Sequence, residues 1–164
     1  MDNYAEKAVK LLLANNLKIA TAESCTGGLV AKMITDISGA SAVFDCGIIS
    51  YSNDIKKSVL GVKKTTLEKH GAVSEETVKE MSGGALSVSG ADISAAISGI
   101  AGPLSDSTDK PVGLIWIAVN FKGKITTKKL NNQFSVNIRE NNRNSAATEA
   151  LKLVCAVIEK ETAV

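Results

Sequence analysis

The sequence predicts an α/β protein in which helices cover both faces of a mixed β-sheet, a three-layer α/β/α sandwich. Two observations lead to this fold class. Segments with helical spacing of apolar residues alternate with short apolar strands, and a hairpin comes late in the chain. A chain of 164 residues can bury about two-thirds of its unfolded surface. We therefore expect residues 1–164 to form a single domain around one core.

The first half of the chain alternates helix and strand. The expected order is helix, strand, helix, strand and short charged helix, over residues 5–13, 17–22, 30–37, 43–51 and 53–59. In the first and third segments apolar residues recur every three or four positions, whereas residues 17–22 alternate like a strand with one half-buried face. Residues 43–51 form a nearly continuous apolar run, which predicts a buried strand.

The second half contains a long helix, three strands and a final helix, over residues 75–89, 93–97, 112–121, 125–130 and 139–158. Ser74 is a typical helix N-cap residue, and Gly90 ends the apolar stripe that includes Val88. Gly123 suits a hairpin turn, and the polar strand after it is expected at a sheet edge. The stripe of the last helix predicts that Cys155 lies in the core.

Composition excludes several classes of protein. The chain has 19 basic and 17 acidic residues and 4% aromatics, with no basic block, which argues against direct nucleic-acid binding. No apolar run is long enough to span a membrane and no signal peptide is visible, so we expect no membrane association and a cytoplasmic protein. Three scattered cysteines and one histidine match no disulfide framework and no metal-ligand spacing, so no metal or other cofactor is expected.

A turn rich in hydroxyls and glycines is the sharpest local feature. It contains Ser24, Cys25, Thr26, Gly27 and Gly28, between a predicted strand and a predicted helix. Such a turn exposes backbone N–H groups that suit a phosphate, a carboxylate or a developing oxyanion, and it offers two hydroxyls and a thiol as nucleophiles. Purely structural roles explain the same residues: Thr26 as an N-cap and the glycines as close-packing residues. The turn matches neither common nucleotide-binding glycine pattern.

Lys56 is the candidate general base. A serine nucleophile needs a base, and in a chain with one histidine a lysine kept neutral by burial is the plausible substitute. Lowering a lysine pKa from about 10.4 to near 8 takes about 3 kcal/mol of differential solvation. Tyr51 is placed to orient this amine or relay a proton. The alternative is that Lys56 shares one solvated basic face with Lys57 and Lys63.

Three further features lie outside these two clusters. Ser98 and Gly99 end a predicted strand, where ligands gather in open α/β sheets, although an ordinary Gly-Pro turn explains them too. Arg139 and Arg143 are the only arginines; they share one helix face and suit a bidentate anion contact or simple solvation. His70 is expected in a loop, where a backbone hydrogen bond is a more ordinary role than catalysis.

Six motifs occur together in the order and spacing of one family. They are ESCTGG at 23–28, GIISYSND..K at 47–56, LGV at 60–62, HGAVSEET at 70–77, SGIAGP at 98–103 and KPVGLIWIAV at 110–119. In these motifs the chain resembles the stand-alone form of the CinA C-terminal domain family, the nicotinamide mononucleotide (NMN) amidohydrolases. The resemblance extends over nearly the whole chain and agrees with the predicted fold.

The resemblance implies hydrolysis of the NMN carboxamide to nicotinate mononucleotide and ammonia, a step in pyridine-nucleotide recycling. At the matching positions, Ser24 would be the nucleophile, Lys56 the general base and Tyr51 an assisting residue. The substrate-binding residues expected from the same resemblance are Glu23, Thr26, Gly27, Gly28, Asn53, Ser98, Gly99, Arg139 and Arg143. The partner would be this small-molecule substrate, and we also expect a homo-oligomer.

Two segments depart from the family pattern. Family members commonly continue the AGP turn with glycines, whereas residues 104–109 read LSDSTD. A Phe, Gly-Asp-Arg, Arg pattern usually precedes the last helix, and here residues 134–139 read FSVNIR. The first departure leaves an alternative function open: a catalytically weakened nucleotide-binding protein, or a competence- or damage-inducible interaction protein.

Overall fold

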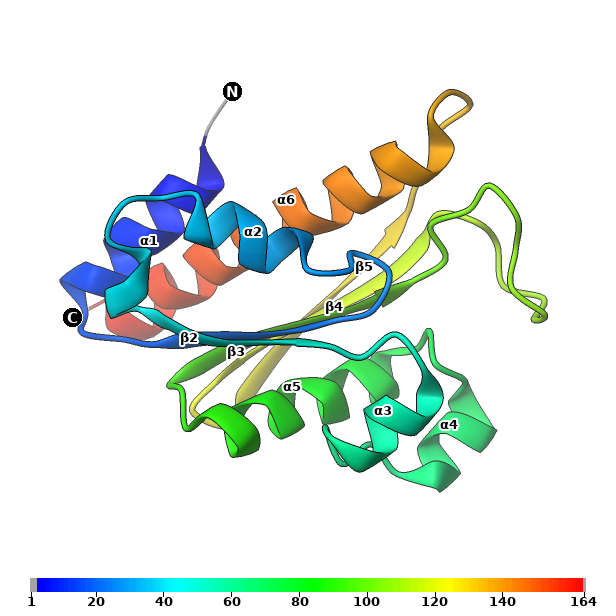
Figure 1. Ribbon diagram of the computed structural model, residues 1–164, viewed down its shortest axis with the longest axis horizontal. Coiled ribbons are helices and arrows are strands. Elements are labelled where there is room, and N and C mark those ends of the chain that lie inside the picture. Colours follow the sequence, from blue (N-terminus) through cyan, green and yellow to red (C-terminus); the bar gives the residue numbers. More distant parts are fainter. Residues whose placement is uncertain (1–2, 164) are drawn as a thin grey trace.

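In a computed structural model, which describes residues 3–163, a five-stranded sheet lies between two layers of helices (Figure 1). The strand order is β2-β1-β3-β4-β5. The strands are β1 (Ile19–Glu23), β2 (Phe44–Ile49), β3 (Ile93–Gly99), β4 (Leu114–Phe121) and β5 (Lys124–Asn131). Strands β2, β1 and β3 are parallel, β4 is antiparallel to β3, and β5 is antiparallel to β4. The predicted α/β/α sandwich with a mixed sheet is confirmed.

Three helices cover each face of the sheet (Figure 1). One layer contains α1 (Tyr4–Ala14), α2 (Leu29–Thr35) and α6 (Ile138–Thr162), and the other contains α3 (Asn53–Ser58), α4 (Lys64–His70) and α5 (Glu75–Ser89). A single 3₁₀ turn (Ala40–Ala42) precedes β2 among the described residues.

The two layers bury side chains of different size. On the α6 side, Ile19 of β1 and Ile93 and Ile97 of β3 pack with the apolar stripe of α6. On the α5 side, alternate residues of the same strands are small, such as Ala20 and Ala96. Alternation along each strand therefore gives each helix layer its own core.

Several local predictions are confirmed. The Ser74 hydroxyl accepts a hydrogen bond from the Thr77 N–H at 3.2 Å, and Gly90 ends α5 in the left-handed conformation. Strands β4 and β5 form the expected hairpin, with β5 at a sheet edge. Cys155 is buried in the core on α6.

The prediction that residues 43–51 form a buried strand is wrong about burial, although a strand is present there. β2 lies at the other sheet edge, and its residues alternate between half-buried and exposed. Its apolar run arises because the strand supplies both cores. The pairing with β1 shifts by one residue between Phe44 and Cys46, so Phe44 packs on the α6 side, whereas Cys46 and Ile48 pack on the α5 side. Conversely, β1 has no half-exposed face, because helices cover both sides of this central strand and all five residues are buried.

Two predictions on the α5 side are also corrected. His70 is the last residue of the helix α4 rather than part of a loop, and α4 was not among the predicted helices. Val88, assigned to the buried stripe of α5, is exposed because it lies near the end of that helix.

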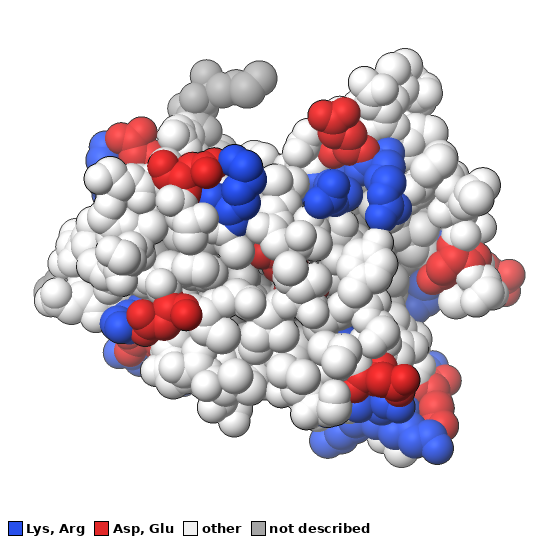
Figure 2. All heavy atoms as spheres, in the orientation of Figure 1, with Lys and Arg blue, Asp and Glu red and all other residues white. Residues whose placement is uncertain are grey.

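The surface shows no broad region of one charge on the face drawn in Figure 2, where basic and acidic groups lie side by side. Several charged side chains form ion pairs, such as Lys18 with Asp45 and Lys32 with Asp36. Within residues 3–163, no helix combines the length and apolar character needed to cross a membrane.

Candidate active site

The candidate site lies where the carboxyl ends of the parallel strands meet. A cavity of about 180 Å³ opens at this edge of the sheet. Ser24 follows β1, Tyr51 follows β2, and Ser98 lies at the end of β3. The predicted site residues that line the cavity are Ser24, Tyr51, Asn53, Lys56, Ser98, Gly99 and Arg139. The parallel topology thus gathers residues that are distant in the sequence.

A serine and a buried lysine lie in hydrogen-bond contact in this cavity. Lys56 Nζ is 2.9 Å from Ser24 Oγ and 2.6 Å from the Ser50 carbonyl oxygen, and donates to both as an ammonium. The Lys56 side chain is 1% exposed. Burial lowers the pKa of Lys56 to about 8, because the ammonium loses its hydration. In its neutral form the amine can accept the Ser24 proton, so this pair has the geometry of an activated nucleophile.

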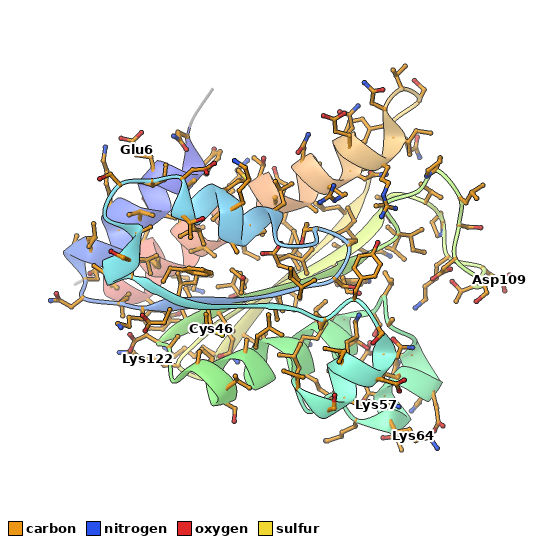
Figure 3. The ribbon with its side chains drawn as sticks, in the orientation of Figure 1. Glu6, Cys46, Lys57, Lys64, Asp109 and Lys122 are labelled. Atoms are coloured by element: carbon orange, nitrogen blue, oxygen red, sulfur yellow. The ribbon has the colours of Figure 1, made fainter. Side chains whose placement is uncertain are left out.

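The short helix α3 aims Lys56 inward. The Ser52 hydroxyl caps α3 by accepting from the Ile55 N–H, and the Lys56 N–H donates to the Ser52 carbonyl. The Lys56 carbonyl in turn accepts from the Val62 N–H. Lys56 therefore does not belong to a solvated basic face, whereas its neighbour Lys57 lies on the outside of this region (Figure 3).

Glu23 has a structural role in place of the predicted substrate contact. Its carboxylate is 1% exposed and accepts hydrogen bonds from the N–H groups of Gly28, Val30 and Ala31 at 2.9–3.1 Å. These bonds satisfy the first N–H groups of α2. Gly28, with φ +94°, is the N-cap residue, not Thr26.

Arg143 holds the turn that carries Ser24 and does not line the cavity. Its Nε donates to the Cys25 carbonyl at 3.2 Å and its Nη2 donates to the Thr26 carbonyl at 2.8 Å. A Cβ atom on Gly27 would lie 3.5 Å from this guanidinium. Thr26 is buried, and its hydroxyl has no hydrogen-bond partner among the described residues. Of the two arginines predicted to suit an anion contact, Arg143 is thus bonded to two backbone carbonyls of the turn.

Arg139 is the arginine that lines the cavity. It donates to the Gly102 carbonyl at 3.0 Å and to the Tyr51 hydroxyl at 2.8 Å. Tyr51 is 61% exposed at the mouth of the cavity. It was predicted to orient Lys56, but its hydroxyl accepts a hydrogen bond from Arg139 instead.

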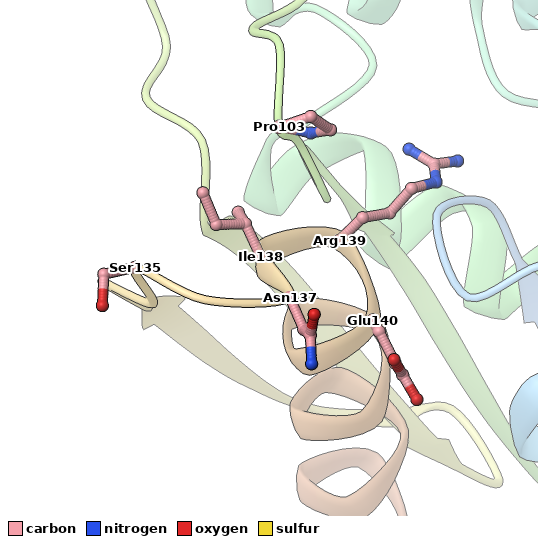
Figure 4. A pocket seen from close by; sticks show the side chains of 6 residues that line it. All are labelled: Pro103, Ser135, Asn137, Ile138, Arg139 and Glu140. Carbon is pink, nitrogen blue, oxygen red and sulfur yellow. The ribbon is translucent and has the colours of Figure 1, made fainter.

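A second hollow adjoins Arg139 at the start of α6. It measures about 430 Å³ and is lined by Pro103, Ser135, Asn137, Ile138, Arg139 and Glu140 (Figure 4). The Arg139 side chain extends away from Ser135 and Asn137 in this view. Arg139 thus lies between the two hollows and lines both.

The remaining candidates separate into lining and packing roles. Burial raises the pKa of the Cys25 thiol to about 12, so Cys25 remains a thiol near neutral pH. The Ser98 hydroxyl donates to the Ala72 carbonyl at 2.7 Å, which joins β3 to the segment before α5. Gly99 has no room for a side chain, because a Cβ would lie 2.6 Å from Ile115 Cγ1. His70 Nδ1 lies 3.5 Å from Glu76 Oε1.

Two residues of the 102–113 segment were missed by sequence reasoning. Asp106 lines the cavity. Lys110 Nζ donates to the carbonyls of His70 and Val73, each at 2.6 Å. Asp106 looked like an ordinary polar loop residue, whereas Lys110 begins the motif at 110–119; no local pattern signals the long-range contacts of either. Among residues 3–163, no group of three or more His, Cys, Asp or Glu side chains is arranged to hold a metal ion.

Residues 1–158 match the CinA C-terminal domain family. The chain belongs to this family. It is 46% identical over 153 residues to the nicotinamide-nucleotide amidohydrolase PncC of Enterobacter agglomerans, covering 93% of this chain and 86% of that protein. It is 49% identical over 153 residues to a CinA-like protein of Kosmotoga olearia, covering 93% of this chain but 36% of that protein. The chain thus spans about a third of the length of several curated relatives that it matches.

Solved structures of the CinA superfamily share the whole fold. A Klebsiella pneumoniae superfamily protein superposes with a TM-score of 0.92 at 34% identity, covering 98% of this chain and 99% of that one. A competence/damage inducible protein of Agrobacterium tumefaciens gives a TM-score of 0.89 at 37% identity, covering 96% of each chain.

Proposed function

We propose that this protein is an amidohydrolase that converts nicotinamide mononucleotide to nicotinate mononucleotide and ammonia. The observation that carries the proposal is the 2.9 Å contact between Lys56 Nζ and Ser24 Oγ, with the lysine buried and its pKa lowered to about 8. The similarity to a relative named as a nicotinamide-nucleotide amidohydrolase supports the choice of substrate.

Ser24 is the proposed nucleophile and neutral Lys56 its base. As Ser24 Oγ attacks the carboxamide carbon, its proton moves to Lys56 Nζ. The N–H groups of Cys25 and Thr26 are the proposed donors to the oxyanion, because those of Ser24, Gly27 and Gly28 already donate to Ile97, Ser24 and Glu23. The Lys56 ammonium then gives its proton to the departing nitrogen, and ammonia leaves an ester on Ser24.

Water completes the proposed cycle. Neutral Lys56 takes a proton from a water that attacks the ester carbon, and returns it to Ser24 Oγ as nicotinate mononucleotide leaves. Arg139, at the cavity mouth beside Tyr51, is the proposed contact for the nucleotide phosphate. Arg143 acts indirectly, by holding the carbonyls of the turn.

Incubation with nicotinamide mononucleotide tests this proposal. Wild-type protein should release equal amounts of ammonia and nicotinate mononucleotide, and Ser24→Ala should abolish both while keeping the thermal midpoint of unfolding. Wild-type turnover no higher than that of Ser24→Ala would contradict the proposal.

A second candidate function is nucleotide binding with weakened catalysis, or an interaction role such as competence or damage response. It is favoured by the 104–109 segment, which places the acidic Asp106 at the cavity, and by relatives named competence/damage inducible. Calorimetric binding of the nucleotide without turnover would support it, and robust deamidation would eliminate it. Cytoplasmic location and self-association stay predictions from the sequence.

A further inference from the structure

Asp106 brings a negative charge to the cavity that holds Ser24 and Lys56. It lies on the 102–113 segment, which projects from the sheet between β3 and β4 (Figure 1). Its Oδ1 accepts from the Thr108 N–H at 3.0 Å and from the Thr108 hydroxyl. Both donors are neutral, so they orient the carboxylate without cancelling its charge.

Four cationic side chains lie in or beside this cavity. Lys56 is buried, and Arg143 and Lys110 are half-buried and held by two backbone carbonyls each. Arg139 also donates to the Gly102 carbonyl and the Tyr51 hydroxyl, but it is the one of the four that is exposed, and it lines the same cavity as Asp106. A phosphate that approaches Arg139 also meets the field of the Asp106 carboxylate.

Four side chains that line the cavity lie at different depths in it, and this indicates which end of a bound substrate each of them would face. Ser24 is half-buried and Lys56 is buried, whereas Asp106 and Arg139 are both exposed. An amide carbon at Ser24 leaves the distal part of a nucleotide, its phosphate, near the exposed pair. A carboxylate and a phosphate dianion several ångströms apart in a watery mouth repel enough to lower affinity by about fivefold.

We propose that Asp106 sets the preference of this site between phosphorylated and unphosphorylated substrates, by opposing the phosphate that Arg139 attracts. The inference rests on the proposed amidohydrolase function. The substrate class would then be pyridine carboxamide ribosides with or without a 5′-phosphate. The preference for the phosphorylated compound would be smaller than if Arg139 acted without Asp106.

The test is the ratio of kcat/KM for nicotinamide mononucleotide to kcat/KM for nicotinamide riboside. The two compounds share the cationic ring, the carboxamide and the ribose hydroxyls, so the ratio isolates the phosphate. In Asp106→Asn, which keeps an oxygen acceptor for Thr108, the ratio should rise by about three- to tenfold. Asp106→Lys should raise it further, and about 0.5 M salt should shrink both changes.

Asp109→Asn is the matched control. Asp109 lies in the same segment, at its outer end (Figure 3), and is not among the residues that line the cavity. This variant removes the same charge and should leave the ratio unchanged. An equal rise in Asp109→Asn would overturn the proposal, because the effect would then come from overall charge.

The remaining outcomes separate this inference from the proposed function. An unchanged or lower ratio in both Asp106 variants overturns the role of Asp106 even if the enzyme is active. If the wild type hydrolyses neither compound, the proposed function fails, and calorimetry with nicotinamide mononucleotide and nicotinamide riboside still decides the inference. In Asp106→Asn the affinity for the mononucleotide relative to the riboside should then rise by about three- to tenfold; an unchanged or lower relative affinity overturns it.

Discussion

The floor and the mouth of the cavity are built in different ways. At the floor, Ser24 follows the strand β1 and Lys56 lies on the helix α3 that follows β2, and Lys56 is buried and bonded to two oxygens. At the mouth, Arg139 and Asp106 are exposed and come from the start of α6 and the projecting 102–113 segment. Burial gives the floor its altered proton affinity, whereas exposed charges in water act weakly. Floor substitutions should therefore change the chemistry, and mouth substitutions should mainly change which substrate binds.

The largest expected effect comes from the floor. Lys56→Met should lower kcat/KM for nicotinamide mononucleotide by about 10³-fold, because it removes the proposed base for Ser24. The fold should survive, since methionine fills a similar volume without a buried charge. Activity assays and thermal unfolding check both results.

Lys57→Met is the control for that variant. Lys57 is the next residue of the same helix, and its ammonium pairs with exposed Asp54 at 2.8 Å. It should keep activity within about twofold, as expected of a surface pair. If both lysine variants lost activity equally, the special role of Lys56 would be ruled out.

The dependence of kcat/KM on pH should reveal the titration of Lys56. Because burial lowers the pKa of Lys56 to about 8, kcat/KM should rise about tenfold per pH unit below pH 8 and level off above it. Initial rates from about pH 6 to 9 check this. A flat profile in that window would contradict a titrating lysine base.

The lowered pKa of Lys56 also predicts how the free energy of unfolding changes with pH. From about pH 8 to 10.5 the folded state holds Lys56 neutral while the unfolded chain still binds the proton. Stability relative to Lys56→Met should therefore increase with pH across that window, by up to about 3 kcal/mol. Below pH 8 both states are protonated, and the full cost of the buried charge is present.

The two arginines offer the most direct comparison of floor and mouth. Arg143→Met should release the Cys25 and Thr26 carbonyls and lower kcat by about tenfold or more with little change in KM, because the nucleophile turn loses its support. Arg139→Gln should instead raise KM for nicotinamide mononucleotide with a smaller change in kcat. Steady-state kinetics of both variants check the split, and the reverse pattern would exchange the two roles.

The sequence predicted the floor better than the mouth for physical reasons. Ser24 and Lys56 lie in local motifs at 23–28 and 47–56, so the family resemblance could pair them in advance, and parallel strands bring the ends of both segments to one edge of the sheet. Glu23 and Arg143 were assigned to substrate from the family resemblance, which does not show what else these side chains contact. Only the fold reveals that the N–H groups of α2 and the carbonyls of the turn occupy them. Asp106 gave no local signal, since its place on the cavity depends on the path of an irregular segment.

The smallest expected effect concerns Cys25, which adjoins Ser24 at the floor. Cys25→Ala should keep activity within about threefold, because burial raises the pKa of this thiol to about 12 and leaves almost no thiolate at neutral pH. The proposed oxyanion donor at this position is the backbone N–H, which alanine retains. Parallel assays of Cys25→Ala and Ser24→Ala, with thermal unfolding of each, distinguish the two nucleophiles. Complete loss in Cys25→Ala with an intact fold would move the attack from the hydroxyl to the thiol.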